Sequence, residues 1–148
     1  MNLFQLTYLS KSELHPLGLH EELEIIQKTA TENNRVKKIS GILIYRNGYF
    51  LQRLEGNRKD IIYLAESIAA DRRQSDFRIL EQEAINERLF NDWTQLLLLS
   101  TKRETQQLDE LFERLAQLHS RNRSIQIDIA KELACITRQL SHVAWLEY

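Results

Sequence analysis

The sequence predicts an α+β domain in which one sheet carries helices, followed by a helical C-terminal extension. An Asn47-Gly48 pair separates two apolar runs. This is the strongest short-range signal for a β-hairpin, because a type I′ turn needs positive φ at both central residues. Two other stretches repeat apolar residues every three or four positions, as helices with one buried face do. The predicted strands are 2–10, 42–45, 49–54, 77–85 and 93–100, and the predicted helices are 19–31 and 57–70.

The second strand of the hairpin carries a polar residue on a face that should be buried. Period-two counting places Phe50, Gln52 and Leu54 on one face of this strand. Arg53 and Glu55 fall on the other face. A buried carboxamide costs a few kcal/mol, about 2–7, if its donors and acceptors find no partner. We therefore expect a polar group to meet Gln52 in the core, the alternative being a bond to neighbouring backbone.

The first predicted strand raises the same question at Tyr8, which shares a face with Phe4 and Leu6. A buried tyrosine hydroxyl usually finds a hydrogen-bond partner. From this strand alone, an ordinary core tyrosine is the simpler interpretation. The segment 10–18 holds the only proline and one of four glycines, so we expect a loop there.

The first predicted helix is followed by a pair of asparagines. Its apolar positions include Ile26 and Ala30, and residues 31–34 are expected to end it. Paired asparagines at a helix end usually provide a C-cap and a turn, which is the first interpretation of Asn33 and Asn34. Their alternative use is to present two carboxamides to the edge of a planar ligand.

The C-terminal third of the sequence reads as cover for the sheet. Both faces of the strand 93–100 are largely apolar, and we expect an antiparallel strand that needs a second layer. Apolar stripes predict helices at 105–119 and 124–140. The elements before them follow the split β-α-β order of the ferredoxin-like fold. We therefore expect a ferredoxin-like βαββαββ domain over 1–100, with two helices on one face, and a two-helix cap over 101–148.

Composition excludes several functions. A net charge of −1 over 148 residues gives no electrostatic reason to expect nucleic acid or an anionic membrane as a partner. The single cysteine, Cys135, excludes an internal disulfide and a cysteine-cluster metal site, and a cytoplasmic location fits. No apolar run approaches the length of a membrane-spanning helix, and no signal-peptide layout is present. Histidine spacing predicts no metal site, and no hydrolytic or phosphoryl-transfer motif appears.

Several motifs in residues 1–100 resemble those of BLUF domains, the blue-light sensors that use FAD. The most specific is Phe50-Leu51-Gln52-Arg53-Leu54-Glu55-Gly56 at its distance after Asn33-Asn34. The other matching blocks are Leu6-Thr7-Tyr8-Leu9-Ser10, Ile39-Ser40-Gly41-Ile42-Leu43, Ile68 with Asp71 and Arg73, and Arg88-Leu89-Phe90-Asn91-Asp92-Trp93.

The resemblance implies a set of FAD-binding residues. In such a domain Gln52 bridges Tyr8 and the N5/C4=O edge of the flavin. The residue Asn34 holds the C4=O and N3 side, with Asn33 beside it. The remaining implied contacts are Ile26 and Ile68 on the two sides of the ring, and Asp71 and Arg73 near the ribityl and phosphate end.

The resemblance also implies a photoreceptor and not an enzyme. Blue light excites the flavin, Tyr8 supplies an electron and a proton, and Gln52 rearranges, so that hydrogen bonding at C4=O strengthens. The signal then passes through the last strand, near Trp93, to the C-terminal helices. Such short BLUF proteins signal by association, with themselves as a homo-oligomer or with a separate downstream partner.

One departure from the family pattern carries a prediction. Gln95 stands where the family usually has methionine, on the same strand face as Trp93. A carboxamide both donates and accepts, whereas a thioether accepts only weakly. We expect Gln95 to bond to Gln52 or to a backbone carbonyl in at least one light state. The alternative is that Gln95 is solvated at the strand's exposed end.

A ferredoxin-like module without flavin is the competing interpretation, either an acylphosphatase-like enzyme or a regulatory small-molecule domain. An acylphosphatase-like enzyme needs a phosphate-cradling loop with an arginine after the first strand. Residues 10–18 offer Lys11 and no arginine. Since function depends on site residues and not on the fold, this interpretation is the weaker one.

Overall fold

The computed structural model describes residues 2–90, 95–97, 106, 109–115 and 131, with the backbone alone at 95–97. The chain divides into two compact units, Met1–Leu97 and Leu98–Tyr148, and each is described by itself. In the second unit, residues 109–115 are helical within the predicted helix 105–119, and residue 131 is helical within 124–140. Trp93, Cys135 and the rest of these two predicted helices lie outside the described residues. The cover of the sheet by residues 101–148 stays a prediction.

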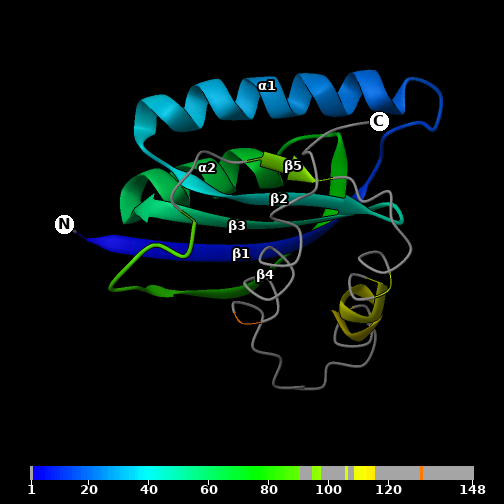
Figure 1. Ribbon diagram of the computed structural model, residues 1–148. Helices are drawn as coiled ribbons and strands as arrows, with labels where there is room; N and C mark the ends of the chain where they lie inside the picture. Colours follow the sequence, from blue (N-terminus) through cyan, green and yellow to red (C-terminus); the bar gives the residue numbers. More distant parts are fainter. Residues whose placement is uncertain (1, 91–94, 98–105, 107–108, 116–130, 132–148) are drawn as a thin grey trace. The chain divides into compact units, whose positions relative to one another are not determined.

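The first unit is built on one sheet of five strands in the order β4-β1-β3-β2-β5 (Figure 1). Its strands are β1 (Leu3–Ser12), β2 (Ser40–Arg46), β3 (Tyr49–Asn57), β4 (Gln74–Ala84) and β5 (Gln95–Leu97). The helices are α1 (Leu19–Lys37) between β1 and β2, and α2 (Arg58–Ala69) between β3 and β4. This is the predicted ferredoxin-like order.

One strand runs in a direction that the sequence did not predict. The strands β1, β2, β3 and β4 pair antiparallel, but β5 pairs parallel to β2, with Ile42 opposite Gln95. The expectation of an antiparallel final strand was therefore wrong. Because β4 and β2 lie on opposite sides of the central strands, the chain crosses the sheet before β5. A crossover permits parallel pairing, which a hairpin does not.

The hairpin β2–β3 forms where the sequence predicts it. The residues Asn47 and Gly48 have φ of 51° and 81°, as a type I′ turn requires. The strands approach closely at Gly41, where a Cβ atom would lie 1.9 Å from the carbonyl oxygen of Arg53. A side chain at position 41 would therefore force the two strands apart.

The helix α1 is longer than predicted, and this corrects the interpretation of its asparagines. It continues to Lys37, so Asn33 and Asn34 lie inside the last turns and not at a C-cap. The cap is Lys38, which adopts the left-handed conformation (φ 55°), and the Ile39 N–H donates to the Asn34 carbonyl at 2.8 Å. Tertiary burial of Asn34, which is 2% exposed, overrides the weak helix propensity of asparagine. By contrast α2 begins as predicted, with Asn57 accepting from the Lys59 N–H at 3.0 Å.

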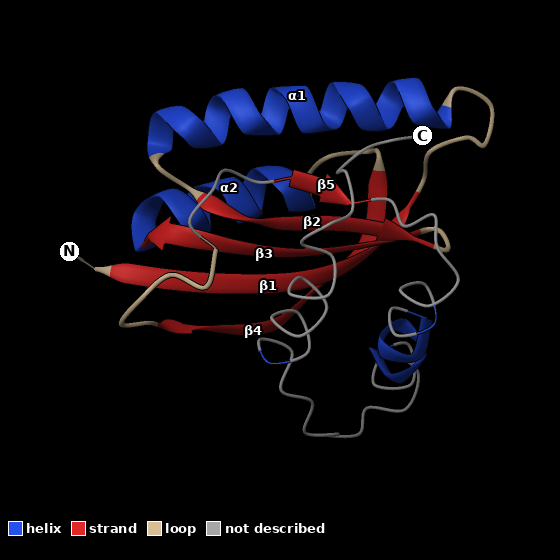
Figure 2. Ribbon diagram, in the orientation of Figure 1, coloured by secondary structure: helices blue, strands red, loops and turns tan. Residues whose placement is uncertain are grey.

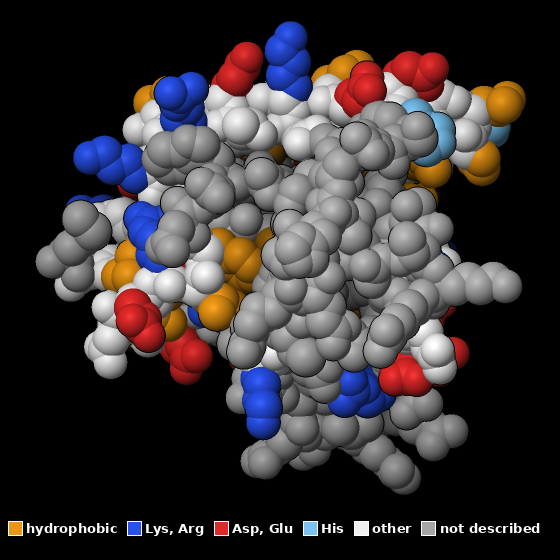
Figure 3. Space-filling model, in the orientation of Figure 1, with side chains coloured by type: hydrophobic (Ala, Val, Ile, Leu, Met, Phe, Trp, Pro, Cys, Tyr) orange, Lys and Arg blue, Asp and Glu red, His pale blue; other side chains and the backbone are white. Residues whose placement is uncertain are grey.

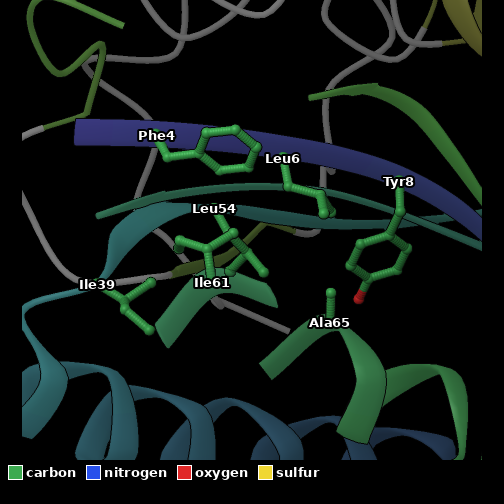
Figure 4. Packing of buried hydrophobic residues seen from close by; sticks show 7 residues of the cluster. All are labelled: Phe4, Leu6, Tyr8, Ile39, Leu54, Ile61 and Ala65. Atoms are coloured by element: carbon green, nitrogen blue, oxygen red, sulfur yellow. The ribbon is translucent and has the colours of Figure 1, made fainter. Parts of the chain in front are cut away.

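Both helices lie on the same side of the sheet (Figures 1 and 2). The core between α2 and the sheet contains Phe4, Leu6, Leu54, Ile61 and Ala65, with Ile39 and Tyr8 at its ends (Figure 4). Along the upper edge of the view, where α1 lies, acidic and basic side chains lie together with some hydrophobic ones (Figure 3). None of the helices in the described part of the chain is long and apolar enough to span a membrane.

Candidate functional site

The central polar pair of the site joins two neighbouring strands. Tyr8 on β1 lies opposite Gln52 on β3 in the antiparallel register. The Tyr8 hydroxyl donates to Oε1 of Gln52 at 2.6 Å, and both residues are 3% exposed. The sequence-based expectation that a polar group meets Gln52 in the core is therefore confirmed, and that group is a side chain and not the backbone.

Tyr8 is held in a low-polarity environment. Its ring lies 4.6 Å from that of Phe77 on β4, with a tilt of 31° between the planes. Figure 4 shows its hydroxyl pointing out of the sheet towards the helix layer. Burial, and secondly the negative charge of Asp71, raise the pKa of Tyr8 above its ordinary value. The hydroxyl therefore stays protonated, and the Tyr8–Gln52 pair is neutral.

A cavity of about 810 Å³, its solvent-open part included, lies beside this pair. All eight residues that the resemblance implied as cofactor contacts line it: Tyr8, Ile26, Asn33, Asn34, Gln52, Ile68, Asp71 and Arg73. Seven further residues complete the lining: Thr29, Ala30, Leu43, Phe50, Leu64, Ser67 and Gln74. The structure thus brings the predicted residues together from β1, β3, both helices and the turn after α2.

The wall on α1 follows from helical spacing. Ile26, Ala30, Asn33 and Asn34 recur at intervals of three and four, so one face of the helix presents them to the cavity together with Thr29. Because the sequence predicts that this helix ends at residue 31, it did not show that Asn33 and Asn34 continue the same helix face. On α2, Leu64, Ser67 and Ile68 also share one helix face. Counting back along this face from Ile68 would have identified Leu64 and Ser67 as lining residues.

A charged pair lies at the turn after α2. The Arg73 guanidinium donates to Oδ2 of Asp71 at 2.6 Å through one terminal nitrogen, and through Nε to Oδ1 at 3.0 Å. This pairing lowers the pKa of Asp71, against the opposing effect of its partial burial, and raises the pKa of Arg73. The pair is partly open to solvent, with 28% and 42% of the two side chains exposed.

Gln74 is a lining residue that the sequence did not assign to the site. Its Nε2 donates to the Ile68 carbonyl at 2.9 Å, and its Oε1 accepts from the Ser10 hydroxyl. It therefore ties the end of α2 to β1 at the edge of the cavity.

Two residues predicted to take part in the photochemistry remain untested. Trp93 lies outside the described residues, and only the backbone of Gln95 is described, paired with Ile42. In the described part of the chain, no three His, Cys, Asp or Glu side chains come together as a metal site.

The cavity has a definite chemical character. Neutral hydrogen-bonding groups of Tyr8, Asn34 and Gln52 lie beside apolar side chains from both helices, and a charged pair stands at one end. Such a lining suits a flat, largely apolar ligand with donors and acceptors along one edge and a polar tail.

Comparison with known proteins agrees with this character. A family model described as BLUF, sensors of blue-light using FAD, matches residues 3–96. The chain is similar to the photoactivated adenylate cyclase subunit beta of Euglena gracilis, with 35% identity over 96 residues, covering 62% of this chain and 11% of that protein. It spans about a tenth of the length of the curated relatives it matches.

Two solved structures have the same fold. The dark-state structure of BlrB, a BLUF protein, gives a TM-score of 0.69 at 27% identity, covering 90% of this chain and 96% of that one. The photo-activated state of BlsA gives 0.75 at 20% identity over 99% of each chain, a likeness that shows the fold alone. Because the family model matches more than half of the sequence, the chain belongs to the BLUF family of blue-light sensors that use FAD.

Proposed function

We propose that this chain is a blue-light photoreceptor that binds FAD in the cavity beside Tyr8 and Gln52 and signals through rearrangement of that hydrogen bond. The observation that carries the proposal is the 2.6 Å bond from the Tyr8 hydroxyl to Gln52, buried at the wall of a cavity that both helices line. FAD is the cofactor by which the family is defined.

The residues present suit a flavin. An isoalloxazine has an apolar ring end and a polar edge of alternating carbonyl and nitrogen groups. Ile26 and Ile68, from different helices, offer apolar contact to the ring, and Gln52 and Asn34 offer carboxamides to the polar edge. Asn33 lies one residue away on the same helix face. Asp71 and Arg73 offer hydrogen-bonding groups to the ribityl and phosphate end.

The chain's own residues account for a reversible signal. When bound, the flavin supplies absorption of blue light and an excited state that is a strong oxidant. Tyr8 is a buried phenol whose only acidic proton is directed at Oε1 of Gln52. The carboxamide of Gln52 has an acceptor end and a donor end, so a rearrangement changes which end faces Tyr8. In this scheme the electron and the proton that Tyr8 gives up in the light both return to it in the dark. No substrate is therefore consumed, and the chain acts as a sensor and not as an enzyme.

One relative is a subunit of a photoactivated adenylate cyclase, as its name states. For this chain we propose that the change passes through β5 to the predicted helices of residues 101–148, and from there to a second copy or a separate cytoplasmic partner.

An absorption spectrum tests the cofactor and the photochemistry together. The purified protein should be yellow, and blue light should shift its flavin band reversibly to longer wavelength. Tyr8→Phe and Gln52→Leu should abolish the shift while retaining the flavin, because each removes one side of the buried hydrogen bond and leaves the other lining residues in place.

Tyr63→Phe is the matched control. This variant also removes a tyrosine hydroxyl, but from a side chain on α2 that is 73% exposed and does not line the cavity. We therefore expect a normal shift. A colourless protein that takes up no FAD would refute the proposal. A normal shift in Tyr8→Phe or Gln52→Leu would refute the roles assigned to those two residues.

A further inference from the structure

A second polar cluster lies on the opposite face of β3 from the cavity, where Glu55 is fully buried. Its Oε1 accepts from the Phe90 N–H at 2.7 Å, and its Oε2 from the Leu89 N–H at 2.9 Å. Two successive backbone amides of the segment that follows β4 are therefore bound by one carboxylate. Charge-assisted bonds of this kind are about twice as strong as neutral ones.

Arg53 supplies the positive charge that this buried carboxylate requires. Its Nε and one terminal nitrogen each lie 3.0 Å from Oε2 of Glu55, and its side chain is 5% exposed. A second terminal nitrogen reaches Glu81 on β4 at 3.4 Å. An unpaired buried carboxylate is strongly destabilising, so the arginine and the two amides together make this position tenable.

Arg88 binds the same segment to the ends of β2 and β3. One terminal nitrogen donates to the Ser40 hydroxyl at 2.6 Å and to the Glu55 carbonyl at 3.0 Å, and the other donates to the Lys38 carbonyl at 2.8 Å. The Ser40 hydroxyl in turn donates to the Phe90 carbonyl at 2.7 Å. We call Arg88, Leu89 and Phe90, with their partners Ser40, Arg53 and Glu55, the latch.

Along the chain, the latch adjoins both the proposed photochemical pair and β5. On one side, Arg53 follows Gln52 directly on β3. On the other, four residues separate Phe90 from Gln95. Five Cα steps span at most about 18 Å, so anchoring Phe90 restricts where β5 begins. The strand β2 provides a second tie, since its Ser40 belongs to the latch and its Ile42 pairs with Gln95.

We propose that the latch is a positioning element of the sensor, which couples changes at Gln52 on β3 to the backbone of β5. Arg53, Glu55 and Arg88 are positioning residues in this scheme, because they act on β5 through the 88–90 backbone and do not line the cavity. The coupling rests on the proposed function, since it gives the light signal a route that does not need contact between the cavity and residue 95.

Hydrogen exchange in the full chain loaded with FAD tests the coupling, in the dark and under blue light. In the unchanged protein we expect protected amides at Leu89 and Phe90, and exchange at residues 95–97 that changes on illumination. Glu55→Gln replaces the carboxylate by a carboxamide of the same size. We expect the two amides to lose about tenfold or more in protection, as removal of a charged acceptor implies. The light-dependent difference at 95–97 should disappear while the flavin shift remains.

Glu81→Gln is the matched control, because it removes a carboxylate that contacts the same Arg53 from the side of β4. We expect it to leave both the protection at Leu89 and Phe90 and the light-dependent difference in place. Should Glu55→Gln not fold, Arg88→Lys replaces it as the test. Lysine keeps the charge but lacks the forked donors, so protection should fall less than in Arg88→Met.

Two outcomes would overturn the coupling. One is an unchanged light-dependent difference at 95–97 in a variant whose Leu89 and Phe90 amides have lost protection. The other is loss of the flavin shift itself in Glu55→Gln. That result would mean that Glu55 acts on the cavity and not on the route from Gln52 to β5. If the unchanged protein takes up no FAD, the proposed function fails and the coupling with it, and the absorption spectrum reports this separately.

Discussion

Gln52 and Glu55 lie three residues apart on β3, on opposite faces of the strand, and the rest of the chain holds them differently. On the cavity face, the neutral carboxamide of Gln52 accepts a hydrogen bond from the Tyr8 hydroxyl. On the other face, the carboxylate of Glu55 accepts from Arg53 and from two backbone amides. A neutral pair exchanges its partners at a cost of about 1 kcal/mol per bond. A buried charge cannot do so without losing its compensation. One face is therefore suited to switching and the other to holding the backbone.

The largest expected effect is on the free energy of unfolding, at the charged pair of Arg53 and Glu55. Arg53→Met leaves the Glu55 carboxylate buried without its ion pair, which should lower the free energy of unfolding by about 3–5 kcal/mol. Gln52→Leu leaves only the Tyr8 hydroxyl without its acceptor, at a cost of about 1–3 kcal/mol. Urea unfolding of both variants in the dark measures the difference. Arg53→Met combined with Glu55→Leu should recover part of the loss, and an equal cost for the two single variants would contradict the contrast.

A second prediction concerns the neutrality of the cavity face. Since the folded-state pKa of Tyr8 is raised, the folded protein keeps this proton when the unfolded chain begins to lose it, near the ordinary value of about 10. Tyr8 therefore contributes stability below pH 10 that is lost as the pH rises, by up to about 1.4 kcal/mol per pH unit. Unfolding measured between pH 9 and about 11 should show a shallower decline in Tyr8→Phe. Identical slopes would show that the phenol is not held in its neutral form.

The smallest expected effect concerns Gln95, whose side chain is neutral like those of Tyr8 and Gln52. We predict that Gln95 bonds to Gln52 or to a backbone carbonyl in at least one light state, at about 0.5–1.5 kcal/mol. If the bond forms in one state only, Gln95→Met and Gln95→Ala should change the rate of dark recovery by up to about tenfold. Recovery kinetics and light-dependent association measure this. Unchanged kinetics in both variants, with the Gln95 side chain directed to solvent, would refute it.

The two faces of β3 also differ in how far the sequence predicts them. The turn at Asn47-Gly48 and the alternation after it place Gln52 on a buried face, since turn chemistry and side-chain period are local properties. The resemblance to BLUF domains implied the other seven of the eight predicted residues that line the cavity, and left the remaining seven lining residues unassigned. The latch was not predicted, because Glu55 takes its backbone donors from a segment more than thirty residues away. The full length of α1 was missed for the opposite reason, since a locally plausible cap at Asn33-Asn34 was overridden by burial.

The alternation of β3 has a consequence for engineering this sensor. Because neighbouring side chains point to opposite faces, inserting or deleting a single residue between the hairpin turn and Gln52 would exchange the two sets. A deletion there would place Arg53 beside Tyr8 and move the Gln52 carboxamide to the face that now carries Glu55. Grafts and chimaeras that join another sequence within this strand must therefore preserve the parity of the residue count, even where every motif residue is retained.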